Sequence, residues 1–226
     1  MKPSVYVIIP VYNETEVIRD VIQNILGRGY EVVIVDDGSE DGLFGVISGL
    51  PVHYIRHELN LGQGAAIQTG IQFAITKDPE ILVTFDADGQ HEANDIPLMI
   101  DYLSVHQLDI VFGSRFLEVS PTKLSAMRKM ILKIARVFNF FFSGIMLSDA
   151  HNGLRVFNNR TAAVLNIIEN KMAHATEILI QIKKNKLKYG EYPVHISYSD
   201  YSKRKGQKIS YGFKIIQDIL LYKFFK

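Results

Sequence analysis

The sequence predicts an α/β protein with a mostly parallel central sheet flanked by helices, a Rossmann-like arrangement. Three observations favour this fold class. Short apolar runs alternate with segments of helical periodicity through the first half of the chain. Those runs are β-branched and apolar on consecutive residues, as strands buried on both faces are. Polar residues follow several runs directly, at the carboxyl ends where open parallel sheets bind ligands.

The first half gives five strands separated by helices. Strands are predicted over residues 4–9, 31–35, 52–56, 81–85 and 109–113. The first helix, over residues 14–26, has Val17, Ile18, Val21, Ile22 and Ile25 at helical spacing and acidic residues near its start. The other helices are predicted from about residue 41 and over residues 64–75 and 96–105. Repeated strand–helix–strand units imply parallel pairing with helices on both faces of the sheet.

The second half of the chain is less regular. A long helical candidate spans residues 123–142 and is rich in Lys, Arg and Phe. The remaining predictions are a loop and short strand at 150–157, helices at 160–168 and 173–185, a strand at 191–197, a basic polar stretch at 199–208 and an amphipathic helix at 210–225. No repeat and no low-complexity linker divides the chain, so we expect a single domain over residues 1–226.

Composition excludes several classes of protein. The chain has 226 residues, 47% of them hydrophobic, and a formal net charge of +1, which argues against a disordered chain and against a dedicated nucleic-acid binder. It has no cysteine, so disulfides and thiolate metal sites are excluded. No apolar run reaches the length of a spanning helix, and the stretch at residues 5–11 is read as a buried strand rather than a signal peptide.

The most informative turn follows the strand at 81–85 and reads Asp86-Ala87-Asp88-Gly89-Gln90. A turn at Gly89 can bring both carboxylates toward one ligand. Mg²⁺ and Mn²⁺ prefer oxygen ligands and often bind through one or two carboxylates together with phosphate oxygens. The alternative is an acidic turn without a ligand, since these residues are also good turn formers.

A second acidic turn, Asp36-Asp37-Gly38-Ser39, follows the strand at 31–35. It is either a helix-capping turn or a site where a carboxylate accepts hydrogen bonds from a base or a ribose. Tyr12 and Glu14, after the first strand, could stack on that base and bind the nucleoside.

Taken together, these turns resemble glycosyltransferase family 2, whose members have the GT-A fold. The resemblance rests on five motifs in the family's order, Ile9-Pro10-Val11-Tyr12-Asn13-Glu14, Val33-Ile34-Val35-Asp36-Asp37-Gly38-Ser39, Asn60-Leu61-Gly62-Gln63-Gly64, Asp86-Ala87-Asp88-Gly89-Gln90-His91 and Gly113-Ser114-Arg115-Phe116. The chain is most similar to the dolichyl-phosphate mannose synthase and polyprenyl-phosphate glycosyltransferase branch. That likeness continues through Asp149-Ala150-His151-Asn152-Gly153-Leu154-Arg155, although Leu154 replaces the usual aromatic residue.

The resemblance implies a nucleotide-sugar-binding half over residues 1–116 and an acceptor-binding half over residues 117–226. The donor would be bound by Pro10, Tyr12, Glu14, Val35, Asp37, Asp86, Ala87, Arg204 and Lys208. The metal, Mg²⁺ or Mn²⁺, would be held by Asp86, Asp88 and Gln90. Catalysis would depend on Asp88, Arg115 and Arg128, the two arginines meeting the acceptor phosphate.

The implied reaction is an inverting transfer from a UDP-sugar or GDP-mannose to a polyprenyl or dolichyl phosphate. A divalent ion stabilises the departing diphosphate, and a lipid phosphate is already anionic, so it needs arginines rather than a strong base. A lipid acceptor implies peripheral binding at the cytoplasmic face of the membrane, directly or through a small membrane protein. The basic stretch at 199–208 would close over the donor, and a homo-oligomer is left open.

Other functions fit parts of the pattern. The acceptor could instead be a growing cell-surface glycan or a lipid-linked oligosaccharide, and a non-catalytic scaffold could use the same fold. Retention of Asp86, Asp88 and Arg115 argues against a scaffold. A processive synthase of the Gln-x-x-Arg-Trp type is disfavoured because the chain has no tryptophan, and a dehydrogenase because no Gly-x-Gly-x-x-Gly follows the first strand.

Overall fold

The computed structural model describes residues 3–117, 137, 140–141, 143–171 and 173–197. The strands are β1 (Val5–Val11), β2 (Glu31–Asp36), β3 (His53–Arg56), β4 (Ile81–Thr84), β5 (Ile110–Ser114), β6 (Arg155–Asn158) and β7 (Tyr189–Pro193). The helices are α1 (Ile18–Leu26), α2 (Leu43–Ile47), α3 (Gln63–Ile75), α4 (Asp95–Val105), α6 (Asn159–Val164) and α7 (His174–Lys184). In this part of the chain, the strands form a single sheet.

The sheet has the order β3-β2-β1-β4-β6-β5-β7 within the described residues. The pairs β1–β2, β1–β4, β2–β3 and β5–β7 are parallel, and only β6 runs antiparallel to its neighbours β4 and β5. The predicted α/β class with a mostly parallel sheet is therefore confirmed. Both chain halves contribute strands to this one sheet.

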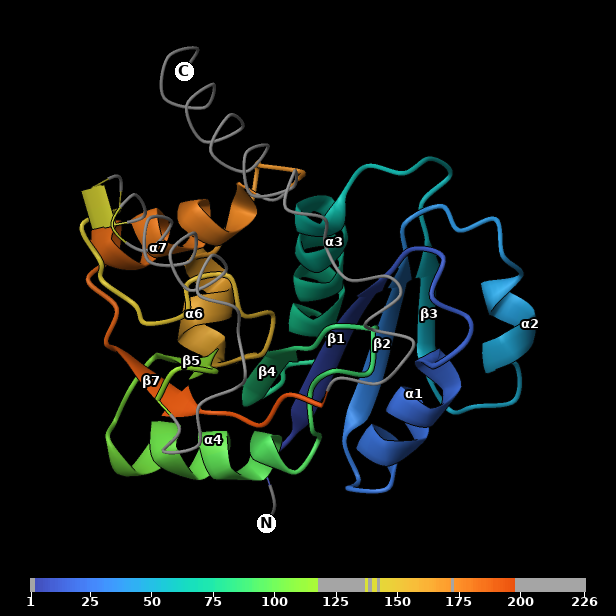
Figure 1. Cartoon of the computed structure of the whole chain (residues 1–226), viewed down its shortest axis with the longest axis horizontal. Helices are drawn as coiled ribbons and strands as arrows, with labels where there is room; N and C mark the ends of the chain where they lie inside the picture. Colours follow the sequence, from blue (N-terminus) through green and yellow to red (C-terminus); the bar gives the residue numbers. More distant parts are fainter. Residues whose placement is uncertain (1–2, 118–136, 138–139, 142, 172, 198–226) are drawn as a thin grey trace.

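Helices cover both faces of the sheet (Figure 1). One core lies between the sheet and α1, α2 and α4, and the other between the sheet and α3, α6 and α7. Along β1 the side chains alternate between the two cores, with Val7 and Ile9 in the first and Ile8 in the second, all of them fully buried. A strand with apolar neighbours on both faces reads as a continuous apolar run, which explains the sequence pattern.

Two predicted elements of the second half are wrong in extent. The helix predicted over residues 160–168 ends at Val164, because the chain beyond it is held by other elements: the Ile167 amide donates to Gln68 Oε1 and the Glu169 amide to Glu177 Oε2. The strand predicted at 191–197 lies over Tyr189–Pro193, where it pairs with β5. Tertiary partners thus override local periodicity in this half. The helical candidates at 123–142 and 210–225 fall largely or wholly outside the described residues.

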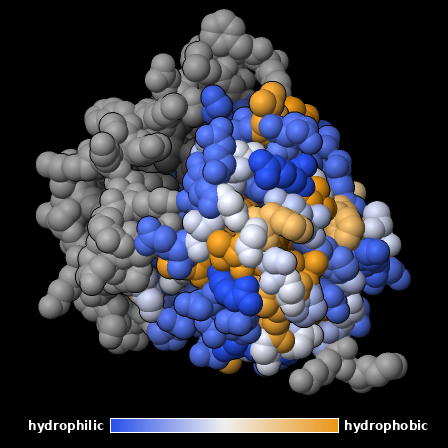
Figure 2. Space-filling view, turned by 90° about the vertical axis from the view of Figure 1, so that its right-hand side faces the viewer, coloured by the Kyte–Doolittle hydropathy of each residue, from blue (hydrophilic) through white to orange (hydrophobic). Residues whose placement is uncertain are grey.

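The surface at the β3 end of the sheet carries small groups of hydrophobic residues among hydrophilic ones (Figure 2). Among the residues that the structure describes, no helix has the length and apolar character needed to span a bilayer.

Candidate functional site

The loops that carry the polar motifs meet at one rim of the sheet. The parallel strands β1, β2, β4 and β5 all end there, and β7 ends there beside β5. Because β6 is antiparallel to β4 and β5, its beginning lies at the same rim. The segment from Asp149 to Leu154, which leads into β6, therefore joins a site otherwise built from strand ends, as expected for ligand binding in an open α/β sheet.

The loops after β1 and β2 are joined to each other. Asn13 has a left-handed backbone (φ 54°), a conformation that asparagine tolerates better than most residues. Its amide donates to Ser39 Oγ (3.0 Å), and its Oδ1 accepts from the Glu40 amide (3.0 Å). Next to it, Tyr12 is 47% exposed. The phenol ring is thus available at the rim, where the sequence predicts stacking on a base.

Asp36 and Asp37, the acidic pair at the end of β2, are buried and accept hydrogen bonds from neighbouring groups. Asp36 accepts from the Ser39 amide (2.7 Å) and the Tyr54 hydroxyl (2.5 Å). Asp37 accepts from the amides of Leu61 (3.0 Å) and Gly62 (2.7 Å), and its Oδ1 lies 2.8 Å from His57 Nδ1. Asp37 therefore fixes the loop between β3 and α3. Its predicted contact with a nucleoside stays a prediction.

Asp86, just beyond β4, is held from two sides. Its Oδ1 accepts from Gln63 Nε2 at the start of α3 (3.1 Å), and its Oδ2 lies 3.3 Å from His91 Nε2. The side chain still exposes 28% of its surface. Burial alone would raise the pKa of Asp86, but the hydrogen bond and charge of His91, together with Arg155 and His174, outweigh burial and lower the pKa.

Asp88 lies near two other carboxylates, those of Asp86 and Glu14. Burial and the charge of Asp86 raise the pKa of Asp88 to about 6, with Glu14 acting in the same direction. The Gln90 amide donates to Asp88 Oδ1 (3.0 Å), which partly opposes the rise. The loops after β1 and β4 thus bring Glu14, Asp86 and Asp88 near one another, and a cation would relieve their repulsion.

Asp86 and Asp88, the acidic pair after β4, could bind a divalent ion whose remaining ligands come from a substrate. Among the described residues, no group of three or more His, Asp or Glu side chains is arranged to hold a metal. Mg²⁺ and Mn²⁺ are commonly bound by one or two carboxylates plus phosphate oxygens and water, without a complete protein cage. Asp86 and Asp88, crowded and partly exposed, match that pattern of donors.

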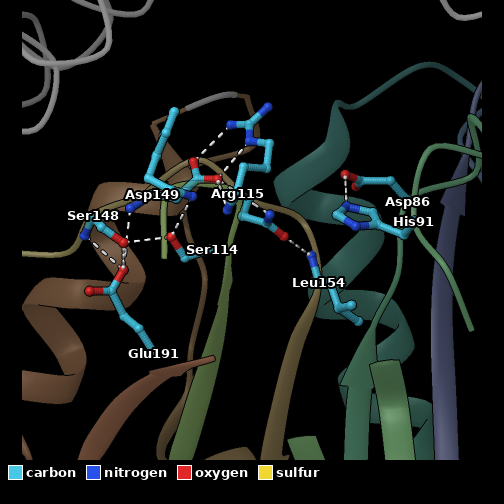
Figure 3. A network of polar contacts seen from close by, with 10 residues as sticks. Asp86, His91, Ser114, Arg115, Ser148, Asp149, Leu154 and Glu191 are labelled. Carbon is cyan, nitrogen blue, oxygen red and sulfur yellow. Dashed lines mark hydrogen bonds and ion pairs between the residues drawn. The ribbon is translucent and has the colours of Figure 1, made fainter. Parts of the chain in front are cut away.

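Arg115, at the end of β5, is held by Asp149 (Figure 3). Its Nε donates to Asp149 Oδ2 (2.6 Å), its Nη2 to Oδ1 (2.7 Å) and its backbone amide to Oδ2 (3.2 Å). Burial alone would raise the pKa of Asp149, but the hydrogen bonds and charge of Arg115 outweigh it and lower the pKa. The paired geometry fixes the plane of the guanidinium.

A second carboxylate anchors the segment that carries Asp149. Glu191 on β7 accepts from the Ser148 amide (2.7 Å), the Ser148 hydroxyl (2.6 Å) and the Asp149 amide (3.3 Å). Figure 3 shows this chain of contacts leading from Glu191 through Ser148 and Asp149 to Arg115, with Asp86 and His91 across the beginning of β6. Sequence reasoning singled out neither Asp149 nor Glu191 as a site residue.

Arg115 also lines a pocket of about 480 Å³. The walls come from the start of α4 and the segment after β7, and the lining includes Leu98, Val194 and Ile196 along with Asp95 and His195. His195 is fixed by Asp95, which accepts from its amide (2.8 Å) and lies 2.9 Å from its Nδ1. The pocket therefore places a cation, a fixed imidazole, apolar surface and the carboxylates of Glu92 and Asp95 side by side.

Arg155 is a charged residue of the site to which the sequence alone assigned no role. It is 3% exposed, on β6, and its guanidinium interacts with the charges of Asp86 and Asp149. Two histidines lie beside it, the buried His174 and the half-buried His151, and burial lowers the pKa of both to about 4. Arg155 occurs in the motif at 149–155. Only the antiparallel placement of β6, which the sequence does not announce, brings it under Asp86.

The other predicted site residues lie at the same rim with different exposure. Pro10 and Gln90 are half-buried, whereas the side chains of Val35 and Ala87 are buried in the two cores, so a ligand would meet only their backbone. The structure thus brings together ten of the predicted residues, Pro10, Tyr12, Glu14, Val35, Asp37, Asp86, Ala87, Asp88, Gln90 and Arg115. The predictions on Arg128, Arg204 and Lys208 lie outside the described residues.

Comparison with known proteins gives matches over most of the chain. The family model described as glycosyl transferase family 2 matches residues 6–162. The UDP-N-acetylglucosamine–dolichyl-phosphate N-acetylglucosaminyltransferase of Methanococcus voltae is 33% identical, over 97% of this chain and 96% of that protein. The polyprenol monophosphomannose synthase of Mycolicibacterium smegmatis is 29% identical, over 67% of this chain and 60% of that protein.

Among solved structures, glucosyl-3-phosphoglycerate synthase from Mycobacterium tuberculosis, in complex with Mn²⁺, UDP and phosphoglyceric acid, has a TM-score of 0.70. The match covers 98% of this chain and 78% of that chain at 13% identity, so the likeness is one of fold.

Proposed function

The chain belongs to glycosyl transferase family 2 and is a glycosyltransferase of the GT-A fold, and from this premise we propose that it moves a sugar from a nucleotide sugar to a polyprenyl or dolichyl phosphate. The donor is a UDP-sugar or GDP-mannose, the reaction requires Mg²⁺ or Mn²⁺, and the enzyme works as a peripheral protein at the cytoplasmic face of the membrane. Relatives named for dolichyl-phosphate and polyprenol acceptors support this acceptor class.

The observation that carries the proposal is the division of the rim into an acidic and a cationic side. Asp86 and Asp88 crowd negative charge at the end of β4, while Arg115 is held in place at the end of β5. β6 lies between these two strands. A donor that brings a diphosphate with a divalent ion suits the first side, and an anionic acceptor suits the second.

The acceptor phosphate binds at Arg115 in this proposal. Asp149 fixes the plane of the guanidinium, so the arginine need not be ordered when the phosphate arrives. The apolar side chains of the adjoining pocket, Leu98, Val194 and Ile196, face the first carbons of the lipid. Arg128, Arg204 and Lys208 supply further cations to the acceptor and to the diphosphate.

The transfer itself is a single displacement at the anomeric carbon. An oxygen of the lipid phosphate forms the new bond to that carbon as the bond to the diphosphate breaks, and the electron pair leaves with the nucleoside diphosphate. No proton has to be removed from the nucleophile, so the residues position and do not deprotonate it. A divalent ion held by Asp86, Asp88 and Gln90 supplies charge neutralisation for the leaving group.

A transfer assay with the purified full-length chain tests the proposal. Undecaprenyl phosphate is incubated with single UDP-sugars or GDP-mannose, with Mn²⁺, Mg²⁺ or EDTA, and the lipid is analysed by mass spectrometry. We expect a glycosyl phosphate lipid with at least one donor, and none with EDTA. Arg115→Gln should abolish product, whereas Arg160→Gln should not, because Arg160 is an exposed arginine at the opposite end of β6, near Asp109.

Sugar transfer to a glycan acceptor but to none of the lipid phosphates would replace the proposed acceptor. Full lipid transfer in EDTA would contradict the metal requirement.

A further inference from the structure

The beginning of β6 forms a floor beneath Asp86. We propose that Gly153 and Arg155 are positioning residues that hold the Asp86 carboxylate toward the donor: Gly153 leaves the space that the carboxylate occupies, and Arg155 places a buried positive charge beneath it. The inference rests on the proposed function, since it assigns to Asp86 a part in donor and metal binding.

Gly153 is needed for space. A Cβ atom built on Gly153 would lie 2.0 Å from Asp86 Oδ2 and 2.2 Å from both Cγ and Oδ1, far inside the 3.0 Å below which such contacts essentially never occur. The whole carboxylate therefore sits where an alanine methyl group would be. The backbone conformation is not the reason for glycine here, because Gly153 is not among the residues with positive φ.

The contact between Gly153 and Asp86 has little room to relax by moving the backbone. Thr84, two residues before Asp86, donates from its hydroxyl to the Gly153 carbonyl (2.7 Å) and is itself buried. The β4–β6 ladder pairs Thr84 directly with Arg155. An added methyl group would consequently push the Asp86 side chain out of its position and away from Gln63 and His91.

Arg155 supplies charge from below. It is 3% exposed and carries a guanidinium that stays protonated in proteins, so it needs negative charge close by. Asp86 and Asp149 are the carboxylates whose charges act on it. Within the described part of the chain, its Nε and Nη1 are buried without a hydrogen-bond partner. Its effect on Asp86 is therefore one of charge at close range rather than of a fixed hydrogen-bonded pair.

These neighbours define which side of Asp86 faces a ligand. Gln63 and His91 contact the carboxylate oxygens, Gly153 backs it and Arg155 lies in the sheet below. The 28% of the side chain that remains exposed is what a donor or its metal can reach. Gly153 and Arg155, around the start of β6, thus share with Gln63 and His91 in setting the position and charge of this carboxylate.

A double-mutant cycle on thermal stability tests the Gly153 contact without any ligand. Melting temperatures are measured for the full-length chain, Gly153→Ala, Asp86→Ala and the double variant. We expect Gly153→Ala to lower Tm by roughly 3 °C or more, and to cost much less in the Asp86→Ala background, where the space has been vacated. If the Gly153→Ala single variant does not fold, a folded double variant would likewise show that the cost of the methyl group comes from its contact with Asp86.

An equal loss of Tm in both backgrounds would overturn the contact, whatever the donor proves to be. Gly190→Ala is the matched control: its Cβ would also be crowded, at 2.7 Å from Leu108 Cδ1, but against the end of a flexible side chain and away from Asp86. Its cost should not depend on residue 86.

The role of Arg155 is tested by a charge-conserving rescue. The Mn²⁺ concentration that gives half-maximal transfer is compared for wild type, Arg155→Lys and Arg155→Met, with folding checked by melting. We expect Arg155→Met to raise that concentration by roughly tenfold and Arg155→Lys to stay within about threefold of wild type. Equal values for Met and wild type would remove Arg155 from the inference. Wild-type transfer without any metal dependence would instead remove the proposed function of Asp86.

Discussion

Two acidic pairs follow β2 and β4, the strands on either side of β1, and their surroundings differ. Asp36 and Asp37 at the end of β2 are 0% and 3% exposed and accept hydrogen bonds from amides, a hydroxyl and an imidazole. Asp86 and Asp88 at the end of β4 remain partly exposed, and burial together with the charge of Asp86 raises the pKa of Asp88 to about 6. The β2 pair stabilises loops, while the β4 pair has capacity for a cation.

The difference shows that the surroundings of a carboxylate, rather than the turn sequence, decide what it does. Both pairs read as acidic turns with glycine close behind. The loop between β3 and α3 returns to Asp37 and satisfies it with two backbone amides. The loop after β4 meets another acidic residue, Glu14, from the first strand's loop. Replacing the same group by its amide should therefore have opposite consequences at the two places.

The largest expected effect is on activity at the β4 pair. Asp88→Asn should reduce transfer by roughly 100-fold or more, because the proposed cation loses a ligand. Its melting temperature in metal-free buffer should stay level or rise, since the substitution removes like-charge repulsion. Steady-state transfer assays and thermal melts check both parts. A marked loss of stability would show that Asp88 is structural, like the β2 pair.

The second-largest expected effect is on the pH dependence of the free energy of unfolding. His151 and His174 have a pKa of about 4 in the folded chain, so between pH 6.5 and 4 the unfolded state binds more protons and stability falls as the pH is lowered. Asp88 acts in the opposite sense, because its raised pKa lets the folded state bind a proton below about pH 6. We expect a net loss on the order of 2 kcal/mol from pH 6.5 to 5, measured by urea unfolding of the metal-free chain.

Asp88→Asn should steepen this loss, and His174→Gln should flatten it. A stability that rises as the pH is lowered from 6.5 to 5 would contradict the lowered pKa values of His151 and His174.

At the β2 pair the main effect should be on stability. Asp37→Asn removes an acceptor from a group that receives two backbone amides and faces an imidazole, and we expect a loss of about 2 kcal/mol in the free energy of unfolding. That corresponds to a fall in Tm of roughly 4–8 °C for a chain of this size. If Asp37→Asn melted like wild type and only lost activity, Asp37 would belong with the β4 pair.

The smallest expected effect comes from the Tyr54 hydroxyl. Tyr54→Phe deletes its hydrogen bond to Asp36 Oδ2, while Asp36 keeps the bond from the Ser39 amide. A loss of about 1 kcal/mol is expected from unfolding titrations. Transfer activity should change less than twofold, because the hydroxyl lies away from the β4 and β5 ends. A large loss of activity would place the β2 pair in contact with substrate.

The sequence was sufficient for the sheet of the first half, because strands buried on both faces must be apolar throughout. The runs ending at Val11 and Asp36 show this, and their predicted starts lie within a residue of the observed ones. The position of the polar residues at the rim could also be predicted, because parallel strands end on the same side of a sheet. The end of α6 was not predicted, because Gln68 on α3 and Glu177 on α7 accept hydrogen bonds from the chain beyond Val164. The extent of β7 was not predicted either, because it depends on pairing with β5.

The support of the site could not be predicted either. Gly153 and Arg155 acquire their roles only because β6 runs antiparallel between β4 and β5, and no local pattern announces that reversal. The same holds for Glu191, which reaches Asp149 from a strand that follows it by some forty residues. Long-range pairing of this kind is decided by the packed fold rather than by periodicity.

Direct binding of Mn²⁺ tests the central claim, that the acidic pair after β4 holds a divalent ion together with a nucleoside diphosphate. Free Mn²⁺ is followed by electron paramagnetic resonance while the full-length chain, with UDP or GDP present, is titrated. Wild type should bind Mn²⁺ at least roughly tenfold more tightly than Asp88→Asn, and Arg160→Gln, at an exposed arginine away from the rim, should bind like wild type. Equal affinity in wild type and Asp88→Asn, with either nucleotide, would contradict the claim.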